Sequence, residues 1–178
     1  MVDTVVKKGR LTSKHVKNPV IAKVSLKNIC LKLLKDKRVK AFLDAIADAE
    51  GGGYNIKFGG GKFTDYSTHP GASKGGKITA AGRYQINKGT WKELCLKLDL
   101  TYFSPATQDL MGVQLLRECK AMDCITSNSL DGALSHASRP WAALPQGPGL
   151  PNRYPGQLYM EYSDFKAKYE ECLKLLKF

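Results

Sequence analysis

A helix-forming stretch that stops at three consecutive glycines constrains this chain most. Its apolar residues follow the i, i+3, i+4, i+7 spacing of an amphipathic helix. They are Val39, Phe42, Leu43, Ile46 and Ala49. Asp36 is suited to cap the start of this helix, and Gly51-Gly52-Gly53 must end it, because glycine is the usual helix stop. Glu50 therefore lies in the last turn, where the helix dipole disfavours a carboxylate and favours a raised pKa.

The segment after the glycine run predicts a β-hairpin. Residues 54–58 and 62–66 alternate apolar and polar side chains, and they are joined by the glycines at 59–61. A loop over 67–80 follows and contains His69-Pro70. The hairpin is the only β-structure that we expect in the chain.

Apolar periodicity predicts helices over most of the remaining sequence. They cover 25–35 with Ser25 as N-cap, a stretch from about residue 89, a stretch after Ser104-Pro105, 129–138 and 162–176. The segment 140–157 is rich in proline and glycine and is expected to be a long loop. The predicted fold class is α+β, mostly helical, with a small hairpin.

Positive charge is concentrated at the N-terminus. Residues 1–40 hold 12 of the 28 lysines and arginines but only two of the 16 acidic residues, a net charge of +10. We therefore divide the chain into a basic arm with an amphipathic helix (1–36) and a main domain (37–178). The arm either binds polyanions, such as anionic envelope polymers or a membrane surface, or serves as a solubility tail. The helix at 25–35 either packs on the domain or docks on a membrane.

Several classes of protein are disfavoured. No apolar run approaches the roughly 20 residues that cross a bilayer, and the N-terminus lacks the apolar core of a secretory signal. The five cysteines are too few and too scattered for a disulfide scaffold, and they form no zinc motif. We expect core thiols, although Cys119 and Cys124 could pair in an oxidising compartment, and we expect a monomer with no metal or cofactor.

Three segments together suggest glycosidic chemistry. Glu50 at a helix end would face the hairpin and the run 81–86, which reads Ala-Gly-Arg-Tyr-Gln-Ile. A general acid for glycoside cleavage must stay protonated near neutral pH, which needs a partly apolar pocket. Tyr66, Tyr84 and Gln85 supply rings that stack on sugars and groups that bind hydroxyls.

These segments resemble the endolysin family of bacteriophage lambda. The shared runs, in the same order, are 41–44 with 49–51, 63–67 with His69-Pro70, 81–85, 103–105 with Gln108-Asp109, and 141–145 with Gly156-Gln157. The resemblance covers about residues 38–178. It implies a lysozyme-like fold and a lytic transglycosylase that cuts the β-1,4 bond between N-acetylmuramic acid and N-acetylglucosamine in peptidoglycan. Such enzymes leave a 1,6-anhydromuramic end.

The resemblance also implies roles for individual residues. Carried over by position, Glu50 is the acid and base, and no metal or cofactor is needed. The residues that we expect to bind the glycan strand are Asn55, Asp65, Tyr66, Tyr84, Gln85, Tyr154 and Gln157. Asn55 stands where the lambda protein has aspartate, so it can hydrogen-bond a sugar but carries no charge. Asp65 has a second interpretation, as a residue that caps a turn.

Other functions remain open at this stage. A hydrolytic muramidase, a virion-associated enzyme that opens the wall at infection, and an envelope- or nucleic-acid-binding protein on an inactive lysozyme scaffold would share much of this sequence. The leading hypothesis is an endolysin made in the host cytoplasm that reaches the cell wall through a separate pore. It predicts no specific nucleic-acid partner.

Overall fold

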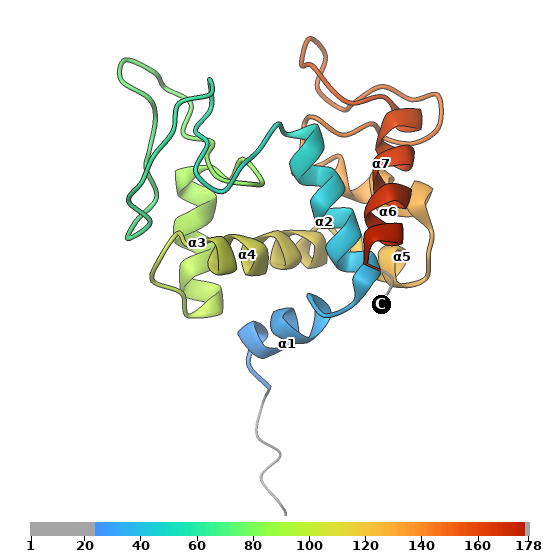
Figure 1. The fold of residues 1–178 in the computed structure, drawn as a ribbon, viewed down its shortest axis with the longest axis horizontal. Helices are drawn as coiled ribbons and strands as arrows, with labels where there is room; N and C mark the ends of the chain where they lie inside the picture. The colour runs from blue at the N-terminus through green and yellow to red at the C-terminus, as the bar shows by residue number, and fades with distance from the viewer. Residues whose placement is uncertain (1–23, 177–178) are drawn as a thin grey trace, which may run out of the picture.

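The computed structural model describes residues 24–176, which contain seven α-helices and no β-strand. The helices are α1 (Leu26–Leu33), α2 (Lys37–Ala49), α3 (Lys88–Leu98), α4 (Pro105–Glu118), α5 (Met122–Thr126), α6 (Leu130–Ala137) and α7 (Tyr162–Leu175) (Figure 1). The predicted helices are therefore confirmed. The short α5 was not predicted. None of the helices in this part of the chain is both long and apolar enough to cross a membrane.

The predicted N-caps form as the sequence indicated. The Ser25 hydroxyl accepts a hydrogen bond from the Asn28 N–H (3.2 Å), and the Asp36 carboxylate accepts one from the Arg38 N–H (2.8 Å). Ser104, whose capping role was not predicted, also caps α4, which has proline in its first turn. These side chains satisfy backbone donors that a helix start leaves without partners, so they fix where each helix begins.

Helix α2 lies at the centre of the molecule. It packs along α7, where the ring of Phe42 meets Phe165 (5.3 Å between ring centroids) and Tyr169 (5.9 Å) edge to face. It also contacts α4 and α5 (Figure 1). Because α2 is held on several sides, the residue at its C-terminal end has a fixed position.

Helix α1 packs on the domain and contacts α3 and α4. Cys30 is completely buried, and Leu33 and Leu34 pack against the core. The structure therefore supports packing for this helix. The other predicted role, docking on a membrane, concerns only the residues that remain exposed. The boundary between residues 36 and 37 stays a prediction, and the basic arm through residue 23 lies outside the described residues.

The predicted hairpin turns back where expected but does not form strands. The Lys57 N–H donates to the Gly61 carbonyl (2.7 Å) and the Phe63 N–H to the Asn55 carbonyl (3.0 Å). Within residues 24–176 this region is paired only by isolated antiparallel bridges, one of which joins Lys57 to Ala81. The segment 54–58 thus pairs partly with residue 62 and partly with residue 81, and it forms a continuous β-ladder with neither segment. The expectation of a regular hairpin is corrected to a bridged turn.

The cysteines are free thiols, as expected for a core role. Cys30 and Cys172 are buried, and Cys95, Cys119 and Cys124 are partly buried. Burial raises the pKa of the Cys119 thiol, which favours its protonated and less reactive form.

Candidate active site

Glu50 lies at the C-terminal end of α2, where the chain leaves for the bridged turn (Figure 1). It is the C-cap residue and is half-buried. Burial raises its pKa to about 7, and a hydrogen bond with the backbone of Ala143 opposes this shift. Such a carboxyl group is divided between its acid and base forms near neutral pH, so it can donate a proton in one step and accept one in the next.

The glycines after Glu50 allow two backbone segments to touch. Gly51 has a φ of +60°, a left-handed conformation that favours glycine. At Gly52, a Cβ atom would lie 2.2 Å from the Arg83 carbonyl oxygen. Only glycine fits there without a backbone shift, and this close contact sets the position of Glu50 relative to the run 81–86.

Asp109 on α4 joins the two segments that flank this contact. Its carboxylate accepts hydrogen bonds from the hydroxyls of Tyr54 (2.9 Å) and Tyr84 (2.7 Å). Burial, and then the charge of Asp109, raise the pKa of Tyr54 to about 12 and raise that of Tyr84 in the same direction. Both phenols therefore stay protonated and serve as donors.

The neighbouring Gln108 binds backbone rather than side chains. It is completely buried, its Oε1 accepts from the Arg83 N–H (2.8 Å), and its Nε2 donates to the carbonyls of Tyr54 (3.0 Å) and Phe103 (2.8 Å). A Cβ atom on Gly82 would lie 2.3 Å from its Oε1. The first turn of α4 thus fixes both loops beside Glu50.

Trp141 holds the loop that brings Ala143 to Glu50. Its indole is 3% exposed, and its Nε1–H donates to the Tyr84 carbonyl (3.1 Å). The loop whose backbone hydrogen-bonds with Glu50 is therefore joined directly to the segment that carries Tyr84.

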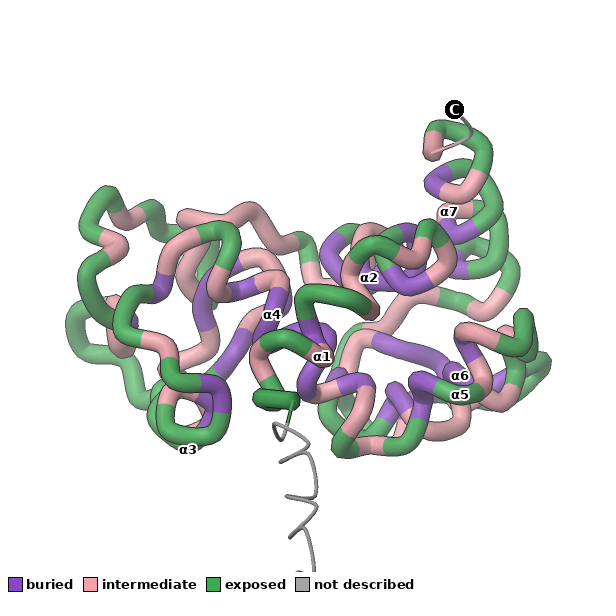
Figure 2. The backbone as a smooth tube through the Cα atoms, turned by 90° about the horizontal axis from the view of Figure 1, so that it is seen from below, coloured by how far each residue is buried: buried purple, intermediate pink, exposed green. Residues whose placement is uncertain are grey.

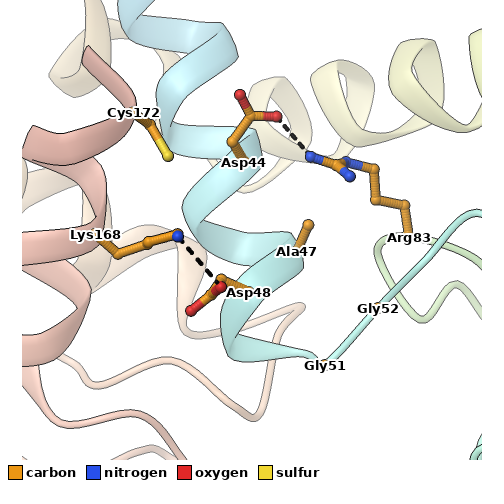
Figure 3. Close-up of a pocket in the computed structure, with 8 residues that line it drawn as sticks. All are labelled: Asp44, Ala47, Asp48, Gly51, Gly52, Arg83, Lys168 and Cys172. Carbon is orange, nitrogen blue, oxygen red and sulfur yellow. Dashed lines mark hydrogen bonds and ion pairs between the residues drawn. The ribbon is translucent and has the colours of Figure 1, made fainter. Parts of the chain in front are cut away.

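A pocket of about 370 Å³ adjoins the turn after Glu50 (Figure 3). Its lining residues are Asp44, Ala47, Asp48, Gly51, Gly52, Arg83, Lys168 and Cys172. Arg83 pairs with Asp44 (2.7 Å) and lies over the Tyr54 ring (5.0 Å to the centroid), and Lys168 pairs with Asp48 (3.6 Å). The charged groups of this pocket compensate one another, and Glu50 is not among its lining residues.

The structure places Asn55, Asp65 and Tyr66 on the bridged-turn side of the site. Asn55 is half-buried. The Asp65 carboxylate accepts from the Ser67 N–H (2.8 Å), and hydrogen bonding to Ser67 lowers its pKa. Asp65 therefore caps a turn, which was its second predicted role. The Tyr66 ring packs on Phe63, with 5.3 Å between centroids.

The other predicted sugar-binding residues lie in two separate segments. Tyr84 is 2% exposed, and Gln85 adopts a φ of +47° while its Nε2 donates to the Gly82 carbonyl (3.0 Å). Both line a small pocket of about 140 Å³. Tyr154 and Gln157 are exposed on the loop before α7, and the Tyr154 hydroxyl donates to the Arg139 carbonyl. A sugar-binding role for these residues stays a prediction.

Sequence reasoning did not assign a role to Tyr54, Gln108, Asp109 or Ala143. Gln108 and Asp109 carried a signal, because they are adjacent polar residues inside a helix whose buried positions are mostly apolar. Nothing local marked Ala143, which contributes only its backbone. In residues 24–176 no group of three or more His, Cys, Asp or Glu side chains could hold a metal ion.

Comparison with known proteins places the chain in a family. The family model described as Endolysin matches residues 40–174. The endolysin of Escherichia phage lambda is 35% identical over 147 residues, which cover 75% of this chain and 89% of the relative. The endolysin of Escherichia phage P2 is 37% identical over 132 residues, which cover 61% of this chain and 80% of the relative.

Solved structures agree with the sequence comparison. Bacteriophage lambda lysozyme complexed with a chitohexasaccharide matches with a TM-score of 0.68 and 32% identity, over 77% of this chain and 94% of that one. Another structure of the lambda lysozyme matches with a TM-score of 0.59 and 30% identity, over 78% of this chain and 91% of that one. The chain has the helical, lysozyme-like fold that the sequence predicted, and it belongs to the endolysin family of peptidoglycan-degrading enzymes.

Proposed function

We propose that this endolysin is a lytic transglycosylase that cleaves the β-1,4 bond between N-acetylmuramic acid and N-acetylglucosamine. The observation that carries the proposal is a single half-buried carboxyl group, Glu50, whose pKa is raised to about 7. In the described residues this shift comes from burial and is opposed only by the Ala143 backbone, with no contribution from a second carboxylate. Glycosidases that use water or an enzyme nucleophile normally pair two carboxyl groups.

One carboxyl group suffices when the sugar supplies the nucleophile. Glu50 donates its proton to the bridging O4 as the C1–O4 bond breaks. It then accepts the proton of the muramic C6 hydroxyl, whose oxygen forms the new C1–O6 bond. Glu50 ends protonated and no water is consumed, so the reaction is balanced. Attack within one sugar ring benefits from proximity, which replaces the second carboxylate.

The substrate of this reaction is a glycan strand. A related lysozyme, similar to this chain over most of its length, is known in complex with a chitohexasaccharide, which supports a long β-1,4-linked sugar as the ligand here. We propose that Asn55, Tyr66, Gln85, Tyr154 and Gln157 bind the strand on the two sides of Glu50. Tyr84 and Asp65 act through the positions they fix, since one binds Asp109 and the other caps a turn. The strand belongs to the host cell wall.

Digestion of purified sacculi tests the reaction type. A transglycosylase releases muropeptides with anhydro ends, which are lighter by one water molecule than hydrolysed ends. Mass spectrometry of the products distinguishes them. Products with reducing muramic ends, together with incorporation of ¹⁸O from labelled water, would instead identify a hydrolytic muramidase.

The Glu50→Gln variant tests the assignment of the acid. Glutamine is nearly isosteric with glutamate but has no acidic proton, so turnover should fall by at least about 10²–10⁴-fold. Circular dichroism and the thermal midpoint report whether the fold is retained. A folded variant with more than about a tenth of the wild-type activity would exclude Glu50 as the acid.

A further inference from the structure

Helix α1 ends, α2 begins and α7 ends toward the same end of the molecule, at the bottom of Figure 1, and Figure 2 views the molecule from this side. A groove with lysine walls lies among these helix ends. It has a volume of about 560 Å³. We call it the basic groove, and it is lined by Leu34, Lys35, Lys37, Lys40 and Leu176. None of these residues belongs to the site around Glu50.

The charge of the basic groove is not compensated by nearby acids. Lys35, Lys37 and Lys40 are exposed, and none of them forms an ion pair within residues 24–176. The one acidic residue among them in the sequence, Asp36, is paired with Arg38 (2.8 Å) and caps α2. A cluster of like charges repels itself, so an anionic partner would relieve an unfavourable arrangement.

The same end of the molecule also exposes large apolar side chains. Leu34 and Leu176, which are partly buried against the core, line the basic groove itself. Outside its lining, Leu31 on α1 is 43% exposed, Leu175 on α7 is 73% exposed, and Val24, just before α1, is 63% exposed. Leucines interleaved with lysines suit the interface of a bilayer, where apolar side chains enter the acyl boundary and ammonium groups reach lipid phosphates. Nucleic acid would use the lysines but would leave the leucines in water.

The position of the basic groove suits a membrane partner. Lys37 begins α2 and Glu50 follows its last residue, so the groove and the catalytic carboxyl group lie at opposite ends of one helix (Figure 1). The thirteen residues of α2 span about 20 Å. A molecule resting on a bilayer through the basic groove would direct the end with Glu50 away from the lipid.

From charge, apolar exposure and position, we propose that the basic groove docks the enzyme on a bilayer that contains anionic phospholipid. Residues 1–23 carry six basic residues and one acid, so like charge opposes their occupying the groove, and they add to the attraction instead. Like charge also opposes pairing of the groove with a second copy of the chain. The inference is independent of the reaction that Glu50 performs.

Co-sedimentation of the full chain with lipid vesicles tests the proposal. Vesicles of phosphatidylglycerol mixed with phosphatidylcholine should bind the protein at low salt, and vesicles of phosphatidylcholine alone should not. Each lysine at an anionic surface strengthens binding about fivefold. The variant Lys35→Glu/Lys37→Glu/Lys40→Glu should therefore bind at least about a hundredfold more weakly, with unchanged activity on soluble glycan fragments.

A matched variant separates the basic groove from total charge. Lys74→Glu/Lys77→Glu/Lys92→Glu makes the same change of net charge on the opposite lobe, where all three lysines are exposed. It should retain binding to within a few-fold. Equal losses in the two variants would overturn the proposal, because attraction through net charge or residues 1–23 would then explain the binding.

Single substitutions test the contribution of apolar side chains to vesicle binding. Leu175→Ser should weaken vesicle binding about tenfold, whereas Leu96→Ser, at a leucine of α3 that is 86% exposed, should have little effect. Analytical ultracentrifugation and binding of a DNA duplex test other occupants. Self-association or DNA binding that the groove variant abolishes, with vesicle binding unchanged, would assign the groove elsewhere and overturn the proposal.

Discussion

At the scale of single residues, the role proposed for Glu50 links activity to pH. In the proposed mechanism its protonated carboxyl group starts the reaction, and burial raises the pKa of this group to about 7. Turnover of soluble glycan should therefore decline above pH 7 and approach a tenfold loss per pH unit. A pH–rate profile of kcat/KM measures this directly. A profile that stays flat from pH 6 to pH 9 would show that the acid has some other pKa.

The same burial makes Glu50 a destabilising residue at high pH. Below pH 4.5, its ordinary pKa, the folded and unfolded states are both protonated and burial of the carboxyl group carries no ionisation cost. Between pH 4.5 and 7 only the unfolded state loses the proton, so the free energy of unfolding falls as pH rises, by up to about 3 kcal/mol.

The Glu50→Gln variant lacks this ionisation. Urea unfolding should find it more stable than the wild type at pH 8 and equal to it, or nearly so, at pH 4. A difference between the two proteins that is constant across this range would contradict the linkage and with it the raised pKa.

At the scale of elements, Asp109 fastens two loops to α4. Asp109→Ala removes the acceptor of two phenol hydroxyls, and hydrogen bonds to a charged group contribute about 1.5–3 kcal/mol each. We expect a loss of roughly 3 kcal/mol in urea unfolding together with reduced kcat. Glu93→Ala, at an exposed acid of α3, removes the same charge and should change stability by less than about 0.5 kcal/mol. Equal effects of the two variants would exclude a structural role for Asp109.

Two glycines should respond oppositely to alanine. Gly52→Ala pushes a Cβ atom into the Arg83 carbonyl and should cost about 1–3 kcal/mol and displace Glu50. Gly89 lies inside α3 with open space around it, so Gly89→Ala should raise stability by about 0.5 kcal/mol. Thermal unfolding and turnover of both variants test this pair, and a stabilised, fully active Gly52→Ala protein would contradict the close contact.

The sequence predicted elements whose signals are local. Ser25 and Asp36 were identified as caps because a cap acts on the next few residues of its own helix. Helix α5 was not predicted because a helix of five residues is too short to show an apolar period, and no side chain caps it. It is held by burial of Met122 and Ile125 in the core.

The residues of the candidate site also differ in whether a local sequence signal marks them. Glu50 was proposed as the acid from its place between a helix and a glycine run. The role of Asp109 could not be found so, because its partners lie 25 and 55 residues away in the chain and only the fold brings them together. The regular hairpin was predicted wrongly, since alternation within 54–58 does not reveal that Phe58 donates its N–H to Ala80 instead of continuing the turn.

At the scale of the whole molecule, the N-terminal charge should act on binding and not on chemistry. Deleting residues 1–23 removes six basic residues and one acid. Lysis of permeabilised cells should slow at low salt, while turnover of small soluble glycans should change little. The difference should shrink toward 1 M salt, where the Debye length falls to about 3 Å. Turbidity assays across a salt series measure it, and equal lysis at every salt concentration would make these residues a solubility tail.

The packing of α2 on α7 also determines when, during synthesis of the chain, α2 can be fully packed. Phe42, on the helix that carries Glu50, is enclosed by Phe165 and Tyr169, which the ribosome adds more than 120 residues later. A nascent chain that stops before Tyr162 lacks α7 and leaves that face of α2 uncovered, so the helix that ends at Glu50 lacks the packing of Phe165 and Tyr169. We therefore expect chains that end before α7 to be inactive, because almost the entire described domain must be made before α2 is fully packed.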